Sequence, residues 1–526
     1  MASLKHLDLV ALFIYLSTIS TISAQPILQW DARYNGPANN WDTALAITVD
    51  DSGNVYVTGA SPGVGTDRDY ATIKYTSDGD TLWVRRFNSP ENGFDIARDI
   101  ALDDSGNVYV TGGSVTLKYD ANGIFQWFAQ NNGECFRVLL DDSGYVYTAG
   151  AGFGNYVTNK FDANGNLIWR RTYNGPANDR DDGYDMAMDS QGNIIVTGRS
   201  WGTGTHWDYA TIKYSSDGDT LWVRRYNGPA ADVPTDMAYA VAVDDSANVY
   251  VTGLSRSSQN RFDCVTISYS PEGELRWLHR YPNSGSQGYG GDDILVDAEG
   301  YIYVAARAGN NDTLLKYGRG GNLIWARANP AELSLATSSP RLALDSFGNI
   351  YMSTGKDSVP TGTTFAAVKY DPMGNRLWLV AYLGLGGPIN ANEAYALHVD
   401  ASGNVYLAGE SLSSGQWFDY ATVKYSQVTG IAPISNNIAE GFRLDQNYPN
   451  PFNATTTIPF SIPAAAQVML KVYNILGQEV ATLVDEKLAA GQYKATWEAT
   501  DFASGVYVYQ LRTNGFTDSK KLLLIK

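Results

Sequence analysis

Short runs of alternating apolar and polar residues fill most of the chain, and clusters of Gly, Asp, Asn and Ser separate them. The first four runs span Leu45–Asp50, Asn54–Gly59, Tyr70–Tyr75 and Thr81–Phe87. Alternation with a period of two is typical of β-strands, and Gly in the intervening turns tolerates the positive φ angles of tight hairpins. Asp and Asn side chains in such turns bond their own backbone. The pattern therefore predicts four antiparallel strands joined by short turns.

This four-run unit occurs eight times between Asp42 and Tyr425. Its Gly-Asn-Val-Tyr-like segment lies at Asn54, Asn107, Tyr145, Asn193, Asn248, Tyr301, Asn349 and Asn404. A tryptophan in the fourth run closes seven units, at Trp83, Trp127, Trp169, Trp222, Trp277, Trp325 and Trp378. Four-stranded antiparallel units spaced by 38 to 55 residues are typical of a β-propeller.

The two ends of the repeat region complement each other. The eighth unit stops at Tyr425 without a fourth run, whereas a run around Trp30 precedes the first unit. We expect this N-terminal run to become the fourth strand of the last sheet and to close a ring, because a linear stack would need capped ends. The sequence predicts an all-β protein with an eight-bladed β-propeller at residues 25–428, its tryptophans packed between adjacent blades.

A ring of this kind has two different faces. The first-to-second and third-to-fourth turns lie on one face, here named the short-turn face. The second-to-third loops and the links between units lie on the other, the varied face, where loops such as Arg199–Asp208 are long and irregular. Candidate ligand-binding residues on the varied face are Arg68, Trp201, His206, Trp207, Arg256, Arg261 and Trp417. For each of these residues, packing at the edge of a blade is the alternative to contact with a ligand.

Acidic residues provide no catalytic site. The segment Asp69–Tyr75 recurs in other units, and a residue needed in several blades holds blades together, whereas a reaction needs one asymmetric constellation. We expect Asp69 and its equivalents to accept backbone N–H bonds. The pairs Asp181-Asp182 and Asp292-Asp293 lie on the varied face and are better carboxylate candidates. No catalytic residue is predicted.

Composition excludes some partners. The net charge is −17 without a Lys/Arg-rich run, so nucleic acid is not an expected partner. The acidic surface favours solubility, with weak calcium binding as the alternative. Cys135 and Cys264 belong to units that are not neighbours, which predicts two buried thiols and no disulfide. The four histidines are too scattered for a metal site, and no cofactor is expected.

The N-terminus has the pattern of an export signal. Lys5 and His6 precede the apolar stretch Leu9–Leu16, and Ser23-Ala24-Gln25 offers a small-residue cleavage point. The stretch is too short to span a bilayer comfortably. We expect residues 1–24 to be a cleaved signal peptide, which leaves no transmembrane segment.

The pattern changes after Tyr425. Residues 429–440 are rich in Gly, Pro, Ser and Asn and are predicted to be a linker. Residues 441–526 contain six alternating runs, at Thr457–Ile462, Val468–Tyr473, Glu479–Val484, Gly491–Glu498, Gly505–Arg512 and Ser519–Ile525. This number of strands predicts a small Ig-like β-sandwich.

The repeats resemble those known as SBBP, or seven-bladed β-propeller, repeats of secreted bacterial proteins, through Asp-x-Ser-Gly-Asn-Val-Tyr-Val-Thr-Gly. The resemblance covers about residues 27–428, although this chain has eight units. The segment Asp162–Trp169 also resembles the docking motif of eight-bladed quinoprotein propellers, which include dehydrogenases and non-enzymatic assembly factors. The adjacent cysteine pair of many such dehydrogenases is absent.

The tail closely resembles the C-terminal sorting domain of the type IX secretion system of Bacteroidetes-like bacteria. The matching sorting-motif residues are Asn447, Tyr448, Pro449, Asn450, Pro451, Phe452, Asn453, Gly477, Lys520 and Lys521. Ala454 and Asn474 depart from the usual proline and aspartate. The resemblance implies passage through the periplasm, recognition by the type IX translocon, tail removal, and release or attachment at the outer cell surface. An adhesive Ig-like module that stays attached is the alternative.

Together these features favour a secreted or cell-surface propeller that binds a glycan or a protein and catalyses nothing. An extracellular enzyme is one alternative, either a polysaccharide lyase or hydrolase or a quinoprotein-like dehydrogenase, with its site on the varied face. A structural surface-layer component is another.

Overall fold

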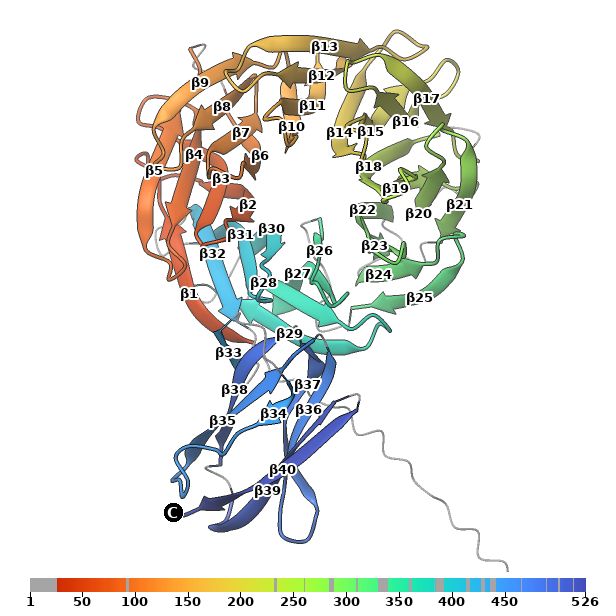
Figure 1. Cartoon of the computed structure of the whole chain (residues 1–526). Helices are drawn as coiled ribbons and strands as arrows, with labels where there is room; N and C mark the ends of the chain where they lie inside the picture. The colour runs from red at the N-terminus through yellow and green to blue at the C-terminus, as the bar shows by residue number, and fades with distance from the viewer. Residues whose placement is uncertain are drawn as a thin grey trace, which may run out of the picture.

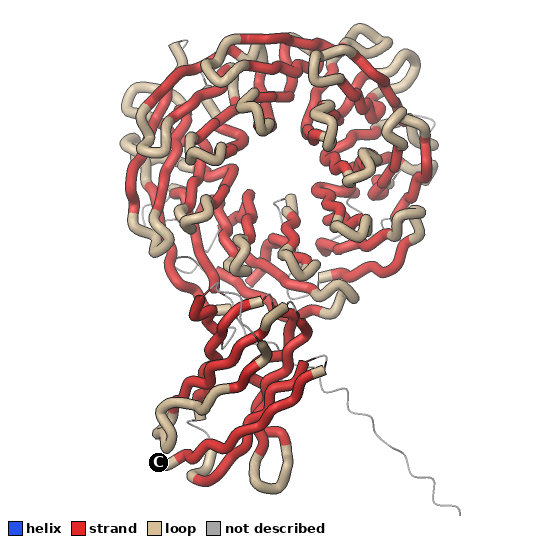
Figure 2. The backbone as a smooth tube through the Cα atoms, viewed as in Figure 1, coloured by secondary structure: helices blue, strands red, loops and turns tan. Residues whose placement is uncertain are grey.

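The computed structural model describes residues 26–526 except 91–93, 231–233, 260, 283–287, 309–310, 330–338, 359–361, 383, 385–391, 413–416, 427–430, 436–440, 465, 489, 500–501 and 514. All regular secondary structure in this described part is β-strand, and the strands form ten four-stranded sheets with antiparallel ladders. Figure 2 shows strands and loops throughout. The predicted signal peptide, residues 1–24, lies outside the described residues.

Eight of these sheets come from the repeat region. The first sheet contains β2 (Thr43–Val49), β3 (Val55–Pro62), β4 (Arg68–Tyr75) and β5 (Thr81–Phe87). The second and third sheets contain β6 (Ala97–Leu102), β7 (Val108–Gly112), β8 (Val115–Tyr119) and β9 (Phe125–Gln130), then β10 (Glu134–Leu140), β11 (Val146–Gly152), β12 (Asn155–Phe161) and β13 (Leu167–Tyr173). The fourth and fifth contain β14 (Asp181–Met188), β15 (Ile194–Trp201), β16 (Trp207–Tyr214) and β17 (Thr220–Tyr226), then β18 (Asp236–Val243), β19 (Val249–Arg256), β20 (Phe262–Tyr269) and β21 (Leu275–Tyr281). The sixth and seventh contain β22 (Gly288–Val296), β23 (Ile302–Ala308), β24 (Asn311–Tyr317) and β25 (Leu323–Ala328), then β26 (Leu342–Leu344), β27 (Ile350–Ser358), β28 (Gly362–Tyr370) and β29 (Arg376–Tyr382).

The eighth sheet joins the two ends of the repeat region. Its strand order is β1-β32-β31-β30, with β1 at Ile27–Tyr34, β30 at Asn392–Val399, β31 at Val405–Leu412 and β32 at Phe418–Ser426. Trp30 stands opposite Lys424 in the antiparallel β1–β32 ladder. The N-terminal strand therefore completes the last sheet, as the sequence predicts. Figure 1 shows the sheets as blades around a central axis, with the first strand of each innermost.

The core of the ring lies between neighbouring sheets. The second and third strands are buried along almost their whole length, so both faces of each sheet pack against other sheets. One interface brings Tyr56 and Trp83 of the first sheet against Val108 and Leu117 of the second. The buried hydroxyls of these strands pair with each other across the ladder, as at Thr58 and Thr72, 2.9 Å apart. Paired hydroxyls remove the cost of burying polar groups.

Aspartates fix the turns on the short-turn face, as predicted. Asp103 accepts the backbone N–H groups of Ser105 and Asn107 at 3.0 and 2.9 Å through one oxygen. Its other oxygen accepts the Tyr109 hydroxyl at 3.1 Å, which ties the turn to the buried strand. The same bonds recur around Asp50, Asp244 and other turn aspartates. These carboxylates are structural.

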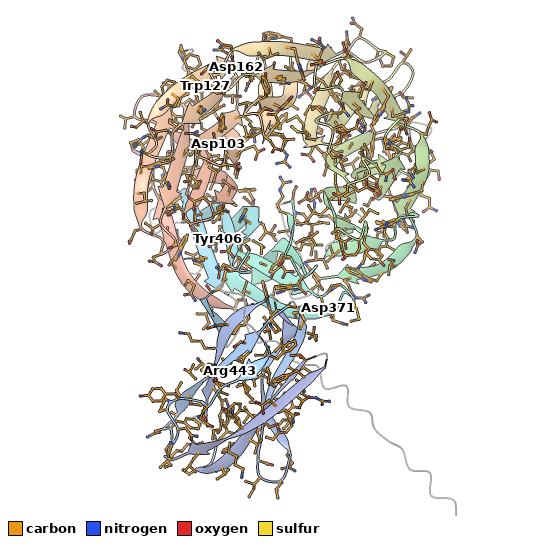
Figure 3. The ribbon with its side chains drawn as sticks, in the orientation of Figure 1. Asp103, Trp127, Asp162, Asp371, Tyr406 and Arg443 are labelled. Atoms are coloured by element: carbon orange, nitrogen blue, oxygen red, sulfur yellow. The ribbon has the colours of Figure 1, made fainter. Side chains whose placement is uncertain are left out.

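Tryptophan and lysine side chains fasten several blades to the next one along the chain. The Trp127 indole N–H and the Lys118 ammonium both donate to the Ala163 carbonyl oxygen of the next sheet, at 3.0 and 3.4 Å. Figure 3 shows Trp127 beside the turn that begins at Asp162. Gly165 in this turn lies against the indole ring, with φ of 81°. We name this arrangement the clasp, and it confirms the tryptophans as wedges between blades.

The clasp also closes the ring. Trp30 and Lys424 of the eighth sheet donate to the Ser77 carbonyl oxygen of the first sheet, at 2.9 and 3.0 Å. Gly79 lies under the Trp30 ring, and a Cβ atom there would be 2.7 Å from it. The last and first sheets are therefore joined by the same contacts as other neighbours.

The prediction that Asp69 and its equivalents accept backbone N–H groups is wrong for Asp69 and Asp208. Asp69 instead pairs with the Arg86 guanidinium at 2.9 Å and accepts the Thr66 hydroxyl at 3.0 Å. Asp42, which directly precedes the innermost strand β2, does accept a backbone N–H, from Gly36 at 2.7 Å. Arg86 lies on the neighbouring strand, 17 positions further along the chain, and nothing in the sequence pattern indicates that it pairs with Asp69.

The tail forms two further four-stranded sheets. One has the order β33-β38-β35-β34 and the other β37-β36-β39-β40. Their bounds are β33 (Ile431–Ser435), β34 (Arg443–Leu444), β35 (Thr455–Ile462), β36 (Ala466–Tyr473), β37 (Glu479–Leu488), β38 (Gly491–Glu498), β39 (Gly505–Thr513) and β40 (Phe516–Leu524). A single core that includes Phe460, Trp497 and Tyr509 draws side chains from both sheets. The six predicted strands are all present. Strand β33 lies inside residues 429–440, so the predicted linker contains the first strand of the tail.

Cys135 and Cys264 are free, buried thiols, as predicted. Burial raises the pKa of each to about 12, which keeps both protonated and unreactive at neutral pH. The described part of the chain contains no helix of the length and apolar character needed to cross a bilayer.

The clasp predicts a specific sensitivity at Gly79. The substitution Gly79→Ala places a Cβ against Trp30 in a residue with φ of 91°, so it combines a clash with backbone strain. Gly65→Ala is a matched control, because φ there is 81° and a Cβ would have open space. We expect Gly79→Ala to lower the unfolding free energy by about 1–3 kcal/mol more than the control. Urea unfolding followed by tryptophan fluorescence measures this, and equal losses would contradict the clasp at the ring seam.

Candidate functional site

A β-bulge occurs at the same place in the innermost strand of seven of the eight sheets described in the repeat region. In the fourth sheet the β14–β15 register shifts between Gly183 and Asp185, which leaves Tyr184 as the extra residue. The equivalent shifts leave Leu45, Arg98, Phe136, Tyr239, Asp292 and Tyr395. In the seventh sheet β26 is short and its described pairs are in regular register. Bulges re-aim side chains and are frequent beside functional sites.

The bulge residues of neighbouring sheets contact each other. The ring centroids of Phe136 and Tyr184 are 5.9 Å apart, and those of Tyr184 and Tyr239 are 5.8 Å apart. The Arg98 guanidinium lies 5.7 Å from the Phe136 ring centre. We name Phe136, Tyr184 and Tyr239 the aromatic arc. Burial raises the pKa of the Tyr184 and Tyr239 phenols, that of Tyr239 to about 12, so both remain neutral hydrogen-bond donors.

Ion pairs flank the aromatic arc. Arg98 pairs with Glu134 at 2.7 Å, Arg199 with Asp182 at 2.7 Å. On the far side of Tyr239, the sixth sheet pairs Arg307 with Asp292 at 2.6 Å. The carboxylate candidates Asp182 and Asp292 are therefore mostly buried partners of arginines, and Asp181 accepts the Gly175 N–H at 2.6 Å. These carboxylates fix the positions of the arginines and of the Gly175 backbone around the arc.

A second charge cluster lies immediately after the bulge. Arg137 pairs with Asp185 of the next sheet at 2.6 Å, and the Asp185 carboxylate raises the pKa of Arg137, with further contributions that include Asp293. Asp99 and Asp293 each accept a backbone N–H of the following sheet, at 3.0 and 2.8 Å. Burial raises the pKa of both carboxyls. We name this the axial charge cluster.

The structure brings three of the predicted ligand-binding residues together. Trp201 and Trp207 are the last paired residues of the β15–β16 ladder, with ring centroids 4.8 Å apart, and His206 lies 4.9 Å from Trp201. Arg199 joins this group to the aromatic arc, since its guanidinium lies 4.0 Å from the Trp207 ring centre and 5.6 Å from that of Tyr184.

The other four predicted residues lie on different sheets. Arg68 is beside Trp41, 5.9 Å from its ring centre, and Arg256 is 5.8 Å from that of Phe262. Arg261 is exposed, and Trp417 is 47% exposed at the start of the eighth sheet's third strand. These residues do not form one site with the Trp201 group. The loops that carry them are also shorter than predicted, because the flanking strands extend toward each other.

A pocket of about 620 Å³ adjoins the aromatic arc on the varied face. Its polar lining comes from the third and fourth sheets and their link, and includes Glu134, Asn155, Asn178, Asp179, Arg180 and Asp182. Two of these residues, Glu134 and Asp182, are the ion-pair partners of Arg98 and Arg199. Arg98 and Arg199, which lie beside rings of the arc, therefore connect it to the pocket. In the described residues no group of three or more His, Cys, Asp or Glu side chains is arranged to hold a metal ion.

In the tail, the predicted sorting-motif residues divide into buried and exposed ones. Asn447 is buried and donates to the Pro449 carbonyl and to the Thr456 hydroxyl, at 3.1 and 2.9 Å. Phe452 is buried in the core and bonds Leu523 and Ile525 through its backbone. Tyr448, by contrast, is 80% exposed.

Several exposed motif residues gather at one end of the tail. Gln446 donates to the Lys521 carbonyl at 2.8 Å, and the Leu523 N–H donates to Asn450 at 2.9 Å, so the Tyr448 loop lies on the C-terminal strand. The β36–β39–β40 registers place the 474–478 turn at the same end of the sheet as Leu524. Ile475 and Leu476 in this turn are each 77% exposed, and Gly477 has φ of 76°. We name Tyr448, Ile475 and Leu476 the distal patch.

Solved structures match this chain at low sequence identity and low TM-score. No curated protein matches it. Among solved structures, PorZ of Porphyromonas gingivalis, an essential surface component of the type IX secretion system, is 13% identical, with a TM-score of 0.33 over 92% of this chain and 81% of its own. A fungal alcohol oxidase of the AA5 family, solved with copper, is 11% identical, with a TM-score of 0.42 over 95% and 100%. Plexin A of Drosophila, solved with Semaphorin 1b, is 12% identical, with a TM-score of 0.40 over 77% and 88%.

The family comparison is specific for the tail. The matched range contains the Tyr448 loop and the two lysines of the predicted sorting motif. Residues 446–526 match the secretion system C-terminal sorting domain, which marks this chain for export through the type IX pathway to the cell surface or the extracellular space.

Proposed function

We propose that the chain is a binding module built on an eight-bladed β-propeller, with its recognition site at the aromatic arc, and that it catalyses no reaction. The type IX sorting domain places the module outside the cell. The tail, in this proposal, is an Ig-like sandwich that serves export.

The variation at the bulge carries this proposal. Seven innermost strands share the same register shift, yet the bulged residue is Leu, Arg, Phe, Tyr, Tyr, Asp or Tyr in the different sheets. The buried positions of the sheets, by contrast, repeat the same residue types. A position that varies on a repeated scaffold is not needed for the fold, and it supplies the asymmetry that recognition of one ligand requires.

The chemistry of the site supports binding without catalysis. The carboxylates beside the aromatic arc accept bonds from arginines, and the tyrosines are protonated at neutral pH. A general base must be within reach of a substrate proton and free to take it. Neutral phenols and paired ions instead provide fixed donors, acceptors and flat surfaces for a ligand.

For the tail, we propose that the distal patch is the surface that contacts the translocon. Exposed large apolar side chains cost solubility. Of the three here, Tyr448 is a motif residue, and Ile475 and Leu476 directly precede the motif residue Gly477. The buried motif residues Asn447 and Phe452 would then hold the Tyr448 loop in place for this contact.

The first test of the proposed function uses Tyr184→Leu, which introduces the residue found at the equivalent position of the first sheet, Leu45. We expect at least a tenfold loss of affinity for the ligand that an array of extracellular proteins and glycans identifies, because hot-spot aromatics contribute about 2 kcal/mol or more. Surface plasmon resonance measures the affinity.

Phe125→Ala is the control for this test. Phe125 is 46% exposed on the outer strand β9, away from the arc, and its truncation should leave both affinity and thermal unfolding unchanged. Equal effects of the two substitutions, or full affinity in Tyr184→Leu, would refute the arc as the recognition site.

The second test concerns export. Leu476→Ser should reduce surface display severalfold and leave the tail folded, because Leu476 is exposed in a turn. Deletion of Ser519–Lys526 removes most of β40 and should trap the chain in the periplasm. Immunoblots of periplasmic and surface fractions measure both, with Lys494→Ala on the exposed face of β38 as the control. Normal display of Leu476→Ser would exclude the distal patch, and normal display of the deletion would exclude the sorting role.

A further inference from the structure

The first and fourth sheets provide an internal comparison within the chain. Residues 35–75 and 174–214 align without a gap at a constant offset of 139 positions, which the equivalent pairs Asp42 and Asp181, and Asp69 and Asp208, illustrate. The backbone contacts are also the same. Gly63 N–H donates to the Asp67 carbonyl at 3.2 Å, and Gly202 N–H donates to the His206 carbonyl at 2.8 Å.

The side-chain contacts that hold the second-to-third loop are shared too. Thr66 donates to Asp69 at 3.0 Å and Thr205 donates to Asp208 at 3.1 Å. Arg86 and Arg225 pair with these aspartates at 2.9 and 2.7 Å. The loop therefore folds in the same way in both sheets, whatever occupies its variable positions.

The two sheets differ at several positions, among them the core pair Tyr56 and Ile195. Five of the differences lie at the bulge and beside the second-to-third loop. The first sheet has Leu45, Ala60, Pro62, Asp67 and Arg68 where the fourth sheet has Tyr184, Arg199, Trp201, His206 and Trp207. Those five residues of the fourth sheet form an unbroken series of contacts, from Tyr184 through Arg199 to Trp207, Trp201 and His206. Since the first sheet folds without them, this series is not required by the fold. We name it the aromatic path.

One ion pair links the pocket to the aromatic path. Near the axis, Asp182 lines the pocket and pairs with Arg199 of the path. The pocket wall offers amides from Asn155 and Asn178, which both donate and accept hydrogen bonds. A polar pocket followed by a row of half-buried rings suits a ligand with hydroxyl edges and flat, weakly polar faces.

The charges of the pocket are balanced. Three carboxylates, Glu134, Asp179 and Asp182, face one lining guanidinium, Arg180, and the adjoining Arg98 and Arg199. Each of these arginines pairs with a carboxylate, Arg180 with Asp182 at 3.1 Å. An anionic ligand would have to displace one of these pairs, and the net charge of −17 on the whole chain opposes it further.

We propose, resting on the binding function above, that this site takes an uncharged oligosaccharide, with one sugar ring in the pocket and the next rings stacked along the aromatic path. A pyranose ring presents C–H groups on its faces and hydroxyls on its edges. The C–H faces match the aromatic rings of the path, and the hydroxyls match the Arg199 guanidinium between Tyr184 and Trp207. The extended row of contacts fits a chain of several sugars.

The experiment uses the full chain and a designed variant of the fourth sheet. The triple change W201P, H206D and W207R introduces the residues that the first sheet has at these three positions. Because the first-sheet loop folds in the same way with these residues, we expect the variant to fold. The probes are cello-, xylo-, malto- and chito-hexaose as uncharged chains, and oligogalacturonate and heparin hexasaccharide as anionic ones. Isothermal titration calorimetry measures binding, and thermal unfolding checks that the variant is folded.

We expect at least one uncharged hexaose to bind, the triple variant to bind it at least tenfold more weakly at an unchanged unfolding midpoint, and the anionic probes to bind more weakly than the uncharged ones. Tighter binding of an anionic probe, full affinity in the triple variant, or no binding of any uncharged probe would overturn the inference. If a protein ligand binds and Tyr184→Leu abolishes that binding, the saccharide inference fails and the binding function stands. If no ligand depends on Tyr184, both fail.

Discussion

The pairing of β1 with β32 is the constraint on which the ring depends. It brings Trp30 and Lys424 onto the Ser77 carbonyl and lets the last sheet pack against the first. The buried cluster at this seam mixes Val57 and Ile73 of the first sheet with Tyr406 and Tyr420 of the eighth. Without the N-terminal strand these surfaces would face water, whereas every other sheet has its fourth strand supplied by its own hairpin. Closure by chain ends removes exposed sheet edges.

Ring closure also explains why the aromatic arc, the proposed recognition site, lies near the axis. Once blades are fastened by the clasp and by turn aspartates, the innermost strands meet around the axis, and their bulges set neighbouring side chains against each other. The axial charge cluster ties consecutive innermost strands together beneath the aromatic arc. The arc is thus supported by buried ion pairs, which holds its rings in fixed positions, and a preformed site avoids the entropy of ordering side chains on binding.

In the tail, as in the ring, buried residues fix the structure and exposed residues form the surface available to a partner. Its core comes from both sheets, and motif residues such as Asn447 and Phe452 point inward, where they fix the loop against the C-terminal strand. Tyr448 and Leu476 point outward from turns. A sequence motif in which buried and exposed residues alternate therefore encodes both the fold of the sorting domain and the surface available to the export machinery.

The sequence by itself determined the strands, the ring closure, the tryptophan wedges and the sorting tail, because each rests on local alternation, turn chemistry or a missing fourth strand that can be read along the chain. It located Trp201, His206 and Trp207 but gave no reason to join them. Only the tertiary structure decided that Tyr184 contacts Phe136 and Tyr239, that Asp69 pairs with Arg86, and that Arg137 pairs with Asp185 of the next sheet. These contacts depend on ladder register and on the approach of sheets far apart in sequence, and neither is recorded in the spacing of residues along one strand.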